Sequence, residues 1–146
     1  MSYQIMINQV FSTFCKSLFI SLIVYLIEYL AKVEFAKEFF SSNLVILLTT
    51  VLAINIATIG VILSRIAALN QGNEHFLEAK KQILFSIKEL IGLIFTALIL
   101  SILTKMNVTV CYAELFSHGI SVLFITVFVY SIFVLYDVAK GLIDIH

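Results

Sequence analysis

The feature that most constrains this chain is an uncharged run of 21 residues, Leu44–Ser64. As a helix, it is long enough to cross a hydrocarbon core about 30 Å thick. A second run, Leu115–Tyr136, also contains no Asp, Glu, Lys or Arg. Both runs predict transmembrane helices.

Two further spans carry charges near their ends. Leu90–Thr104 is uncharged but spans only about 23 Å as a helix. It therefore must extend back through residues 83–87, with Lys88 snorkelling to the interface. An N-terminal span includes Lys16 and Glu28, each within two turns of an end. The predicted spans, within a single domain 1–146, are 10–31, 44–66, 83–104 and 115–137.

Composition supports a membrane protein. Apolar residues make up 62% of the 146 residues and charged residues 12%, against about 45–50% and 25% in soluble domains. A soluble fold of this size cannot hide that much apolar surface, so the lipid bilayer is the expected partner. The net charge is zero and no basic stripe is present, which argues against direct nucleic-acid binding. The predicted class is an all-α integral membrane bundle of four helices.

The sequence signals for the turns between the predicted helices differ in strength. Glu28 and Lys32 are spaced i,i+4, which favours a first helix that continues past the membrane and turns at Ser41-Ser42-Asn43. Asn43 is then the expected N-cap of the second helix. The clearest turn signal, Asn70–Asn73, predicts a hairpin of helices two and three.

Orientation follows from the positive residues. Five flank the spans on the side of the N-terminus and three on the other, namely Arg65, Lys80, Lys81, Lys88 and Lys140 against Lys32, Lys37 and Lys105. Both termini are therefore expected in the cytoplasm of a bacterium, with the protein in the inner membrane. The hairpin of helices two and three is expected to project into the cytoplasm.

Small residues form one narrow stripe on the second helix, at spacings of three and four: Thr50, Ala53, Ala57, Gly60, Ser64 and Ala67. Such residues let helices approach closely in lipid. Two interpretations stay open, a subunit interface in a homo-oligomer or packing within the chain. Helix three has a polar face within about a third of its circumference, formed by Gln82, Ser86, Glu89, Thr96, Ala97, Ser101 and Thr104. Because one chain has few ways to bury both this face and the stripe, we expect an oligomer, with a tetramer favoured.

Polar residues within the spans need partners. Asn55, Thr58 and Arg65 lie opposite the stripe and are candidates for lining a pore. Glu89 lies about one turn inside the third span, and we predict that it forms an intramembrane ion pair with Arg65. The alternative is a ring of Glu89 side chains around an oligomer axis.

No catalytic pattern is present in the sequence. It contains no Gly-rich phosphate loop and no Ser/His/Asp set. Cys111, Glu114 and His118 share one helical face, but three groups without a visible fourth ligand do not make a metal site. The chain is therefore predicted not to be an enzyme and to use no cofactor or metal.

A cytosolic protein partner has one expected docking surface, at the start of helix three. Exposed apolar groups among mixed charges are typical of an interface anchor and its rim. The candidate residues are Glu74, Phe76, Leu77, Glu78, Lys80 and Lys81. Packing of Phe76 against a neighbouring helix is the alternative.

The plan of the whole chain resembles the small four-helix membrane subunits of bacterial anti-phage systems, such as the membrane partner in Kiwa. The resemblance rests on length, four spans, cytoplasmic termini, the turn Asn70–Asn73 and the projecting segment Glu74–Lys81. It implies an oligomer that senses or perturbs the inner membrane together with a cytosolic partner in antiviral defence. The alternatives are a small channel or holin-like pore, and a scaffold subunit of a larger membrane complex.

Overall fold

Four long helices form the structure, a computed structural model that describes residues 3–68, 73–105 and 113–143. Within these ranges, the described side chains are those of residues 7–61, 63–64, 81, 84–105 and 115–140. The helices are α1 (Tyr3–Ala31), α2 (Phe35–Ala68), α3 (Asn73–Lys105) and α4 (Ala113–Ile143).

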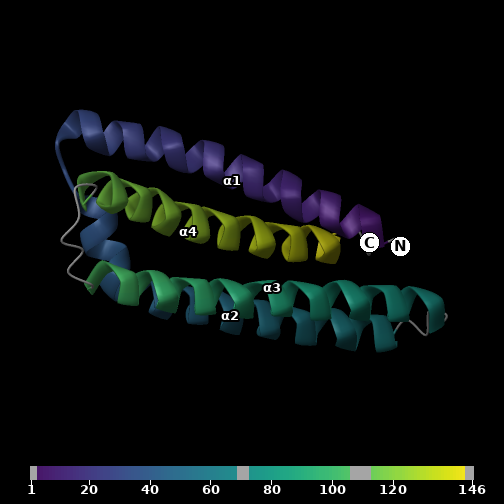
Figure 1. The fold of residues 1–146 in the computed structure, drawn as a ribbon. Helices are drawn as coiled ribbons and strands as arrows, with labels where there is room; N and C mark the ends of the chain where they lie inside the picture. The colour runs from purple at the N-terminus through teal and green to yellow at the C-terminus, as the bar shows by residue number, and fades with distance from the viewer. Residues whose placement is uncertain (1–2, 69–72, 106–112, 144–146) are drawn as a thin grey trace.

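All four helices are long and apolar enough to cross a membrane, which confirms the predicted all-α class and the number of spans. The candidate spans are Ile7–Ala31, Phe35–Val61, Leu84–Lys105 and Leu115–Lys140. The helices run alternately in opposite directions, so the α2–α3 turn lies at the same end as the two termini (Figure 1). At that end the α2–α3 hairpin reaches beyond the end of α4 (Figure 1).

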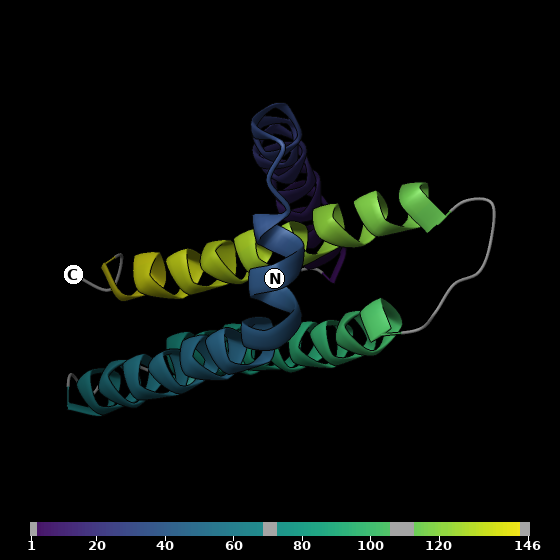
Figure 2. The same cartoon turned by 90° about the vertical axis from the view of Figure 1, so that its left-hand side faces the viewer.

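The helices lie in three layers, with α4 between α1 on one side and the α2–α3 hairpin on the other (Figure 1). Half of the residues in the most apolar segment of α4 are buried, against 11% of those in the most apolar segment of α1. Among the described helices, α1 packs mainly on α4 and crosses it obliquely (Figure 2). The last helix in the sequence is therefore the centre of the bundle.

An apolar core fills the space between the hairpin and α4. Phe124 and Leu44 are fully buried at its centre, beside Ala97 of α3. The small side chain of Ala97 lets α3 approach α4 closely. A second cluster of Leu90, Tyr130 and Val134 lies nearer the hairpin turn.

The predicted end of the first helix is wrong. The structure ends α1 at Ala31, and α2 already includes the Ser41-Ser42-Asn43 segment, so Asn43 is not an N-cap. Lys32 has a left-handed backbone with φ 53°. Lys32 N–H donates to Tyr29 O and Val33 N–H to Glu28 O, the pair of hydrogen bonds that ends a helix in a Schellman motif.

Glu28 explains why the i,i+4 spacing with Lys32 misled the prediction. Its carboxylate does not pair with Lys32 within one helix. It points to the start of α2, where Oε1 accepts a 2.6 Å hydrogen bond from the backbone N–H of Ala36. This bond satisfies one of the unpaired donors at the start of α2. The Ser41 and Asn43 side chains instead bond to backbone carbonyls of Glu38 and Phe39. Such bonds bend helices, and α2 bends near its beginning (Figures 1 and 2).

Candidate functional site

The small-residue stripe of α2 points away from the rest of the chain. Its five described members, Thr50, Ala53, Ala57, Gly60 and Ser64, are all exposed, and the side chain of Ala67 lies outside the described residues. A Cβ atom added at Gly60 would meet nothing within 4 Å. Thr50 and Ser64 each donate to a backbone carbonyl of α2 itself, that of Ile46 and that of Val61. Packing within the chain therefore does not cover the described part of the stripe.

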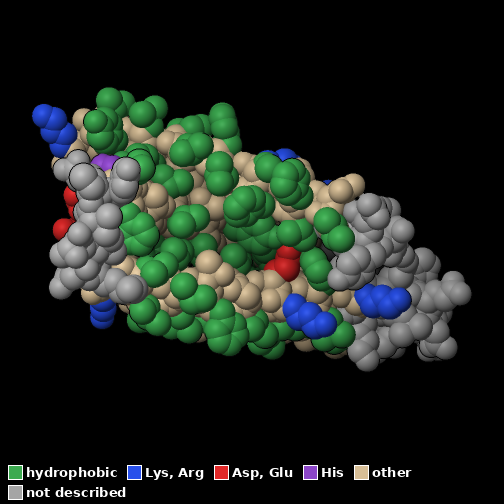
Figure 3. Space-filling view, viewed as in Figure 1, with side chains coloured by type: hydrophobic (Ala, Val, Ile, Leu, Met, Phe, Trp, Pro, Cys, Tyr) green, Lys and Arg blue, Asp and Glu red, His purple; other side chains and the backbone are tan. Residues whose placement is uncertain are grey.

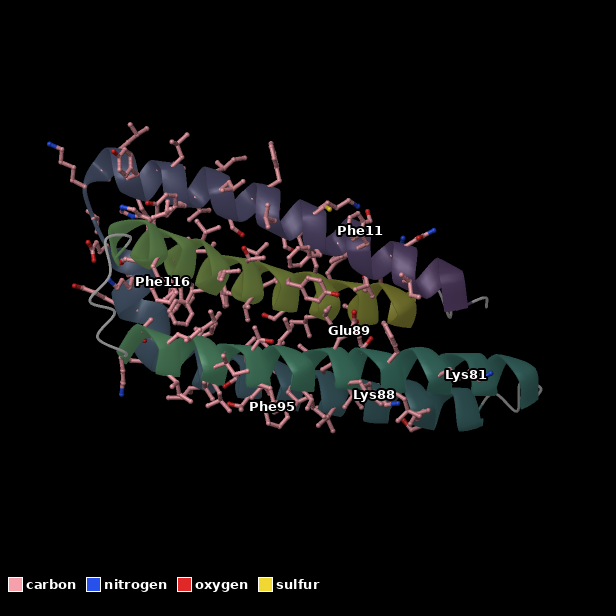
Figure 4. All side chains as sticks on the ribbon, in the orientation of Figure 1. Phe11, Lys81, Lys88, Glu89, Phe95 and Phe116 are labelled. Carbon is pink, nitrogen blue, oxygen red and sulfur yellow. The ribbon has the colours of Figure 1, made fainter. Side chains whose placement is uncertain are left out.

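Glu89 is held by Tyr130 in the structure. The Tyr130 hydroxyl donates a 2.7 Å hydrogen bond to Glu89 Oε1, joining α4 to α3. Figure 4 shows Glu89 between these helices, whereas its neighbour Lys88 points away from α4. The space-filling view shows an acidic side chain in the furrow between the two layers (Figure 3).

The predicted partner of Glu89, Arg65, has a side chain outside the described residues. Its backbone position is described, three residues before the end of α2, about 4.5 Å from that end. Glu89 lies sixteen residues after the start of the antiparallel α3, about 24 Å from that start at 1.5 Å per residue. The Arg65–Glu89 pair stays a prediction, and the hairpin register favours Tyr130 as the partner.

Asn55 is the polar residue of the spans that the structure buries most deeply on α2. It is fully buried, and neither its Oδ1 nor its Nδ2 has a hydrogen-bond partner among the described residues. Thr58 is half-buried and donates to Ile54 O. The face opposite the stripe is thus turned into the bundle of a single chain.

Only part of the polar face predicted on α3 is turned into the bundle. Glu89, Ser86, Ser101 and Thr104 are half-buried and Ala97 is buried, but Thr96 is exposed. The Thr96 hydroxyl donates to Gly92 O, so it meets the surroundings without an unsatisfied donor. The side chain of Gln82 lies outside the described residues.

The sequence analysis did not identify the interface of α1 with α4. Residues at four-residue spacing form it on α1, where Ser17 and Ser21 are fully buried. The hydroxyl oxygens of Ser21 and Thr126 lie 2.9 Å apart. Towards one end Gln9 Nε2 donates to Asp137 Oδ2 over 3.5 Å. The signal available in the sequence was the series Gln9, Thr13, Ser17, Ser21 and Tyr25.

At the other end, three helix ends are joined by polar side chains. Tyr25 Oη and His118 Nδ1 lie 2.6 Å apart, linking α1 to α4. Lys37 Nζ donates a 2.6 Å hydrogen bond to Ser117 Oγ, linking α2 to α4. His118 is thus engaged by Tyr25, while the other two members of its predicted face, Cys111 and Glu114, have no described side chains. Within the described residues, no group of three His, Cys, Asp or Glu side chains is placed to hold a metal ion.

The predicted docking surface lies largely outside the described side chains. The backbone of Glu74, Phe76, Leu77, Glu78 and Lys80 belongs to α3, and only Lys81 has a described side chain, which is exposed. Figure 4 shows Lys81 on the part of the hairpin that passes the end of α4. Comparison with known proteins finds no matching family model, curated protein or solved structure.

Proposed function

We propose that this chain is a non-enzymatic membrane subunit that works as a homo-oligomer in the bacterial inner membrane. The exposed small-residue stripe on α2 carries the proposal. Lipid chains make few favourable contacts with a stripe of small side chains, whereas the backbone of a second helix can approach the stripe closely. Thr50 and Ser64 are already bonded to their own helix, so an approaching helix has no hydrogen bonds to replace.

The assembly is tested by Gly60→Leu, which places a large side chain on the stripe. Because a Cβ atom at Gly60 meets nothing within 4 Å, the single chain should fold as before. Gly92→Leu on α3 is the matched control, since Gly92 is also exposed with open space around its Cβ position. We expect the wild type and Gly92→Leu to have the mass of an oligomer in mild detergent, with a tetramer favoured. Gly60→Leu should have a lower mass, because its side chain blocks the stripe. A wild type that is monomeric at micromolar concentration overturns the proposal.

The biological role that we propose is antiviral defence, in which the oligomer senses or perturbs the membrane together with a cytosolic partner. The hairpin extends past the end of α4 (Figure 1), and this supports the role because the extension would offer a docking surface to a cytosolic partner. The test is a Phe76→Ala, Leu77→Ala double variant. Normal membrane insertion and oligomer mass, with loss of phage protection and of a co-purifying cytosolic protein, are expected. Loss of the oligomer itself would identify these residues as internal packing.

A small channel or holin-like pore is the second candidate, favoured by the half-buried side chain of Glu89 between α3 and α4 (Figure 4). In an oligomer, several copies of this carboxylate could form a ring that attracts cations. Ion flux into liposomes that depends on Glu89, and that Glu89→Gln abolishes, would favour the pore over the defence subunit that only senses.

A further inference from the structure

The core between α2, α3 and α4 contains an amide that the described part of the chain leaves unsatisfied. Asn55 is fully buried, and its Oδ1 and Nδ2 both lack a hydrogen-bond partner. Burying unpaired polar atoms costs free energy, and lipid around the bundle offers no replacement. A group that is not part of the polypeptide is therefore expected beside this amide.

The hairpin register places Asn55 close to the level of Glu89. Asn55 lies thirteen residues before the end of α2, and Glu89 lies sixteen residues after the start of the antiparallel α3. At 1.5 Å per residue these are about 20 Å and about 24 Å from the two helix ends that lie at the same end of the bundle. Along the helix axes, the two residues therefore lie at similar levels.

The faces of the helices agree with this placement. Val51 and Leu52, one turn before Asn55, pack against the cluster that includes Leu90 and Tyr130. Residues three and four apart share a helical face, so Asn55 is also directed towards that cluster. Tyr130 is the residue that binds Glu89, which brings three polar groups from three helices to one part of the core.

The place is also accessible from outside the bundle. Glu89 is half-buried, and the furrow between α3 and α4 exposes an acidic side chain (Figure 3). Tyr130 occupies only Oε1 of the carboxylate, which leaves Oε2 as an acceptor. A small ligand can therefore reach the Glu89 carboxylate from outside the bundle, with the buried Tyr130 hydroxyl bonded to it and the Asn55 amide deeper in the core.

We propose that Asn55, Glu89 and Tyr130 form a binding site for a monovalent alkali cation. Their ligand atoms are amide, carboxylate and phenol oxygens, the type that hard cations prefer. One carboxylate balances one positive charge, so the occupied site is neutral, which lowers the cost of holding Glu89 within the membrane. The three side chains belong to a single chain, so the site does not require the proposed oligomer.

The experiment is thermal unfolding of the full-length protein in mild detergent, with NaCl, KCl or LiCl replaced by N-methylglucamine chloride at constant ionic strength. Binding to the folded state raises the unfolding midpoint in a saturable way, by about 4 °C at ten times the dissociation constant. Such a rise is expected with at least one alkali cation. Equal midpoints in all four salts would mean that water alone satisfies the Asn55 amide, and the proposal fails.

Two variants locate the effect. Asn55→Leu should abolish the cation response and raise the midpoint in N-methylglucamine, because it removes two unpaired polar atoms from the core. Glu89→Gln should also abolish the response. Glu38→Gln, which removes an exposed carboxylate near the start of α2, is the matched control and should keep it. A cation response that persists in both Asn55→Leu and Glu89→Gln would place the cation elsewhere and overturn the proposal.

Discussion

The phenolic hydroxyl of Tyr130 and the carboxylate of Glu89 form a 2.7 Å hydrogen bond within the membrane-spanning part of the bundle. This bond joins the central helix α4 to the hairpin at a place where apolar contacts surround it. It gives the acidic side chain a partner on a neighbouring helix, which a carboxylate inside a membrane-spanning helix requires.

Tyr130→Phe and Glu89→Gln should therefore be coupled in their effects on unfolding free energy. Tyr130→Phe removes the donor of this bond, and Glu89→Gln weakens the bond by replacing a charged acceptor with a neutral one, so the double variant should cost up to about 1 kcal/mol less than the sum of the two. Denaturant or thermal unfolding in detergent measures the cycle. Additive effects would show that the bond contributes nothing to stability in the folded protein.

The same cycle with Arg65→Gln tests the predicted ion pair. If Arg65 binds Glu89, these two variants couple as strongly as the first pair. If the positions of Arg65 and Glu89 along the hairpin keep them too far apart to interact, the effects of the two variants add within about 0.5 kcal/mol. Either result selects one partner for Glu89.

Lys32→Gly should stabilise the protein by about 0.5–1 kcal/mol. Lys32 has φ 53° at the end of α1, a backbone conformation that glycine adopts without steric cost. Lys32→Ala removes the same charge but keeps the Cβ atom, so it should give no gain. A stabilisation of equal size in both variants would attribute the effect to charge and not to the backbone.

Glu28→Ala should destabilise the protein by about 1 kcal/mol, the usual cost of losing a helix cap. Its carboxylate accepts the hydrogen bond from the Ala36 N–H at the start of α2. Glu28→Gln keeps an acceptor oxygen and should cost less. Unfolding midpoints of the two variants give the comparison, and an unchanged midpoint in Glu28→Ala would contradict the capping role.

Ser21→Leu should disturb the packing of α1 on α4, because Ser21 is fully buried there. Inserting a large side chain into a filled interface costs about 1–3 kcal/mol. Ser21→Ala removes the contact with Thr126 and the hydrogen bond from the Ser21 hydroxyl to Ser17 O, and the loss of the contact between helices should cost about 0.6 kcal/mol, a typical value for such bonds in membranes. If Leu is tolerated as well as Ala, α1 does not pack on α4 through this residue.

The number and type of helices could be predicted because charge-free length alone determines them. Leu44–Ser64 needs no partner to be recognised as a span. The break at Lys32 could not, because the Glu28–Lys32 spacing fits a helix and a lysine gives no sign of a left-handed backbone. The Schellman hydrogen bonds at Lys32 and the contact of Glu28 with Ala36 reveal that the chain turns there.

The arrangement of the helices was harder to predict than their existence. The periodicity placed the small residues of α2 on one face but did not predict whether that face points into the bundle or away from it. The buried serines of α1 had the same spacing as many helical surfaces, so they did not indicate α4 as their partner. Tyr130 is one of several aromatic residues in an apolar helix, and nothing in its neighbours pointed to Glu89.

The contact between Ser21 and Thr126 joins residues 105 positions apart in the chain. A ribosome that adds about 5–20 residues per second needs about 5–20 s to cover that distance. A helix α1 that enters the bilayer as it is synthesised spends this interval there without its partner. Its largely apolar exposed surface suits that wait, because lipid can surround α1 until α4 inserts and covers its row of hydroxyl groups.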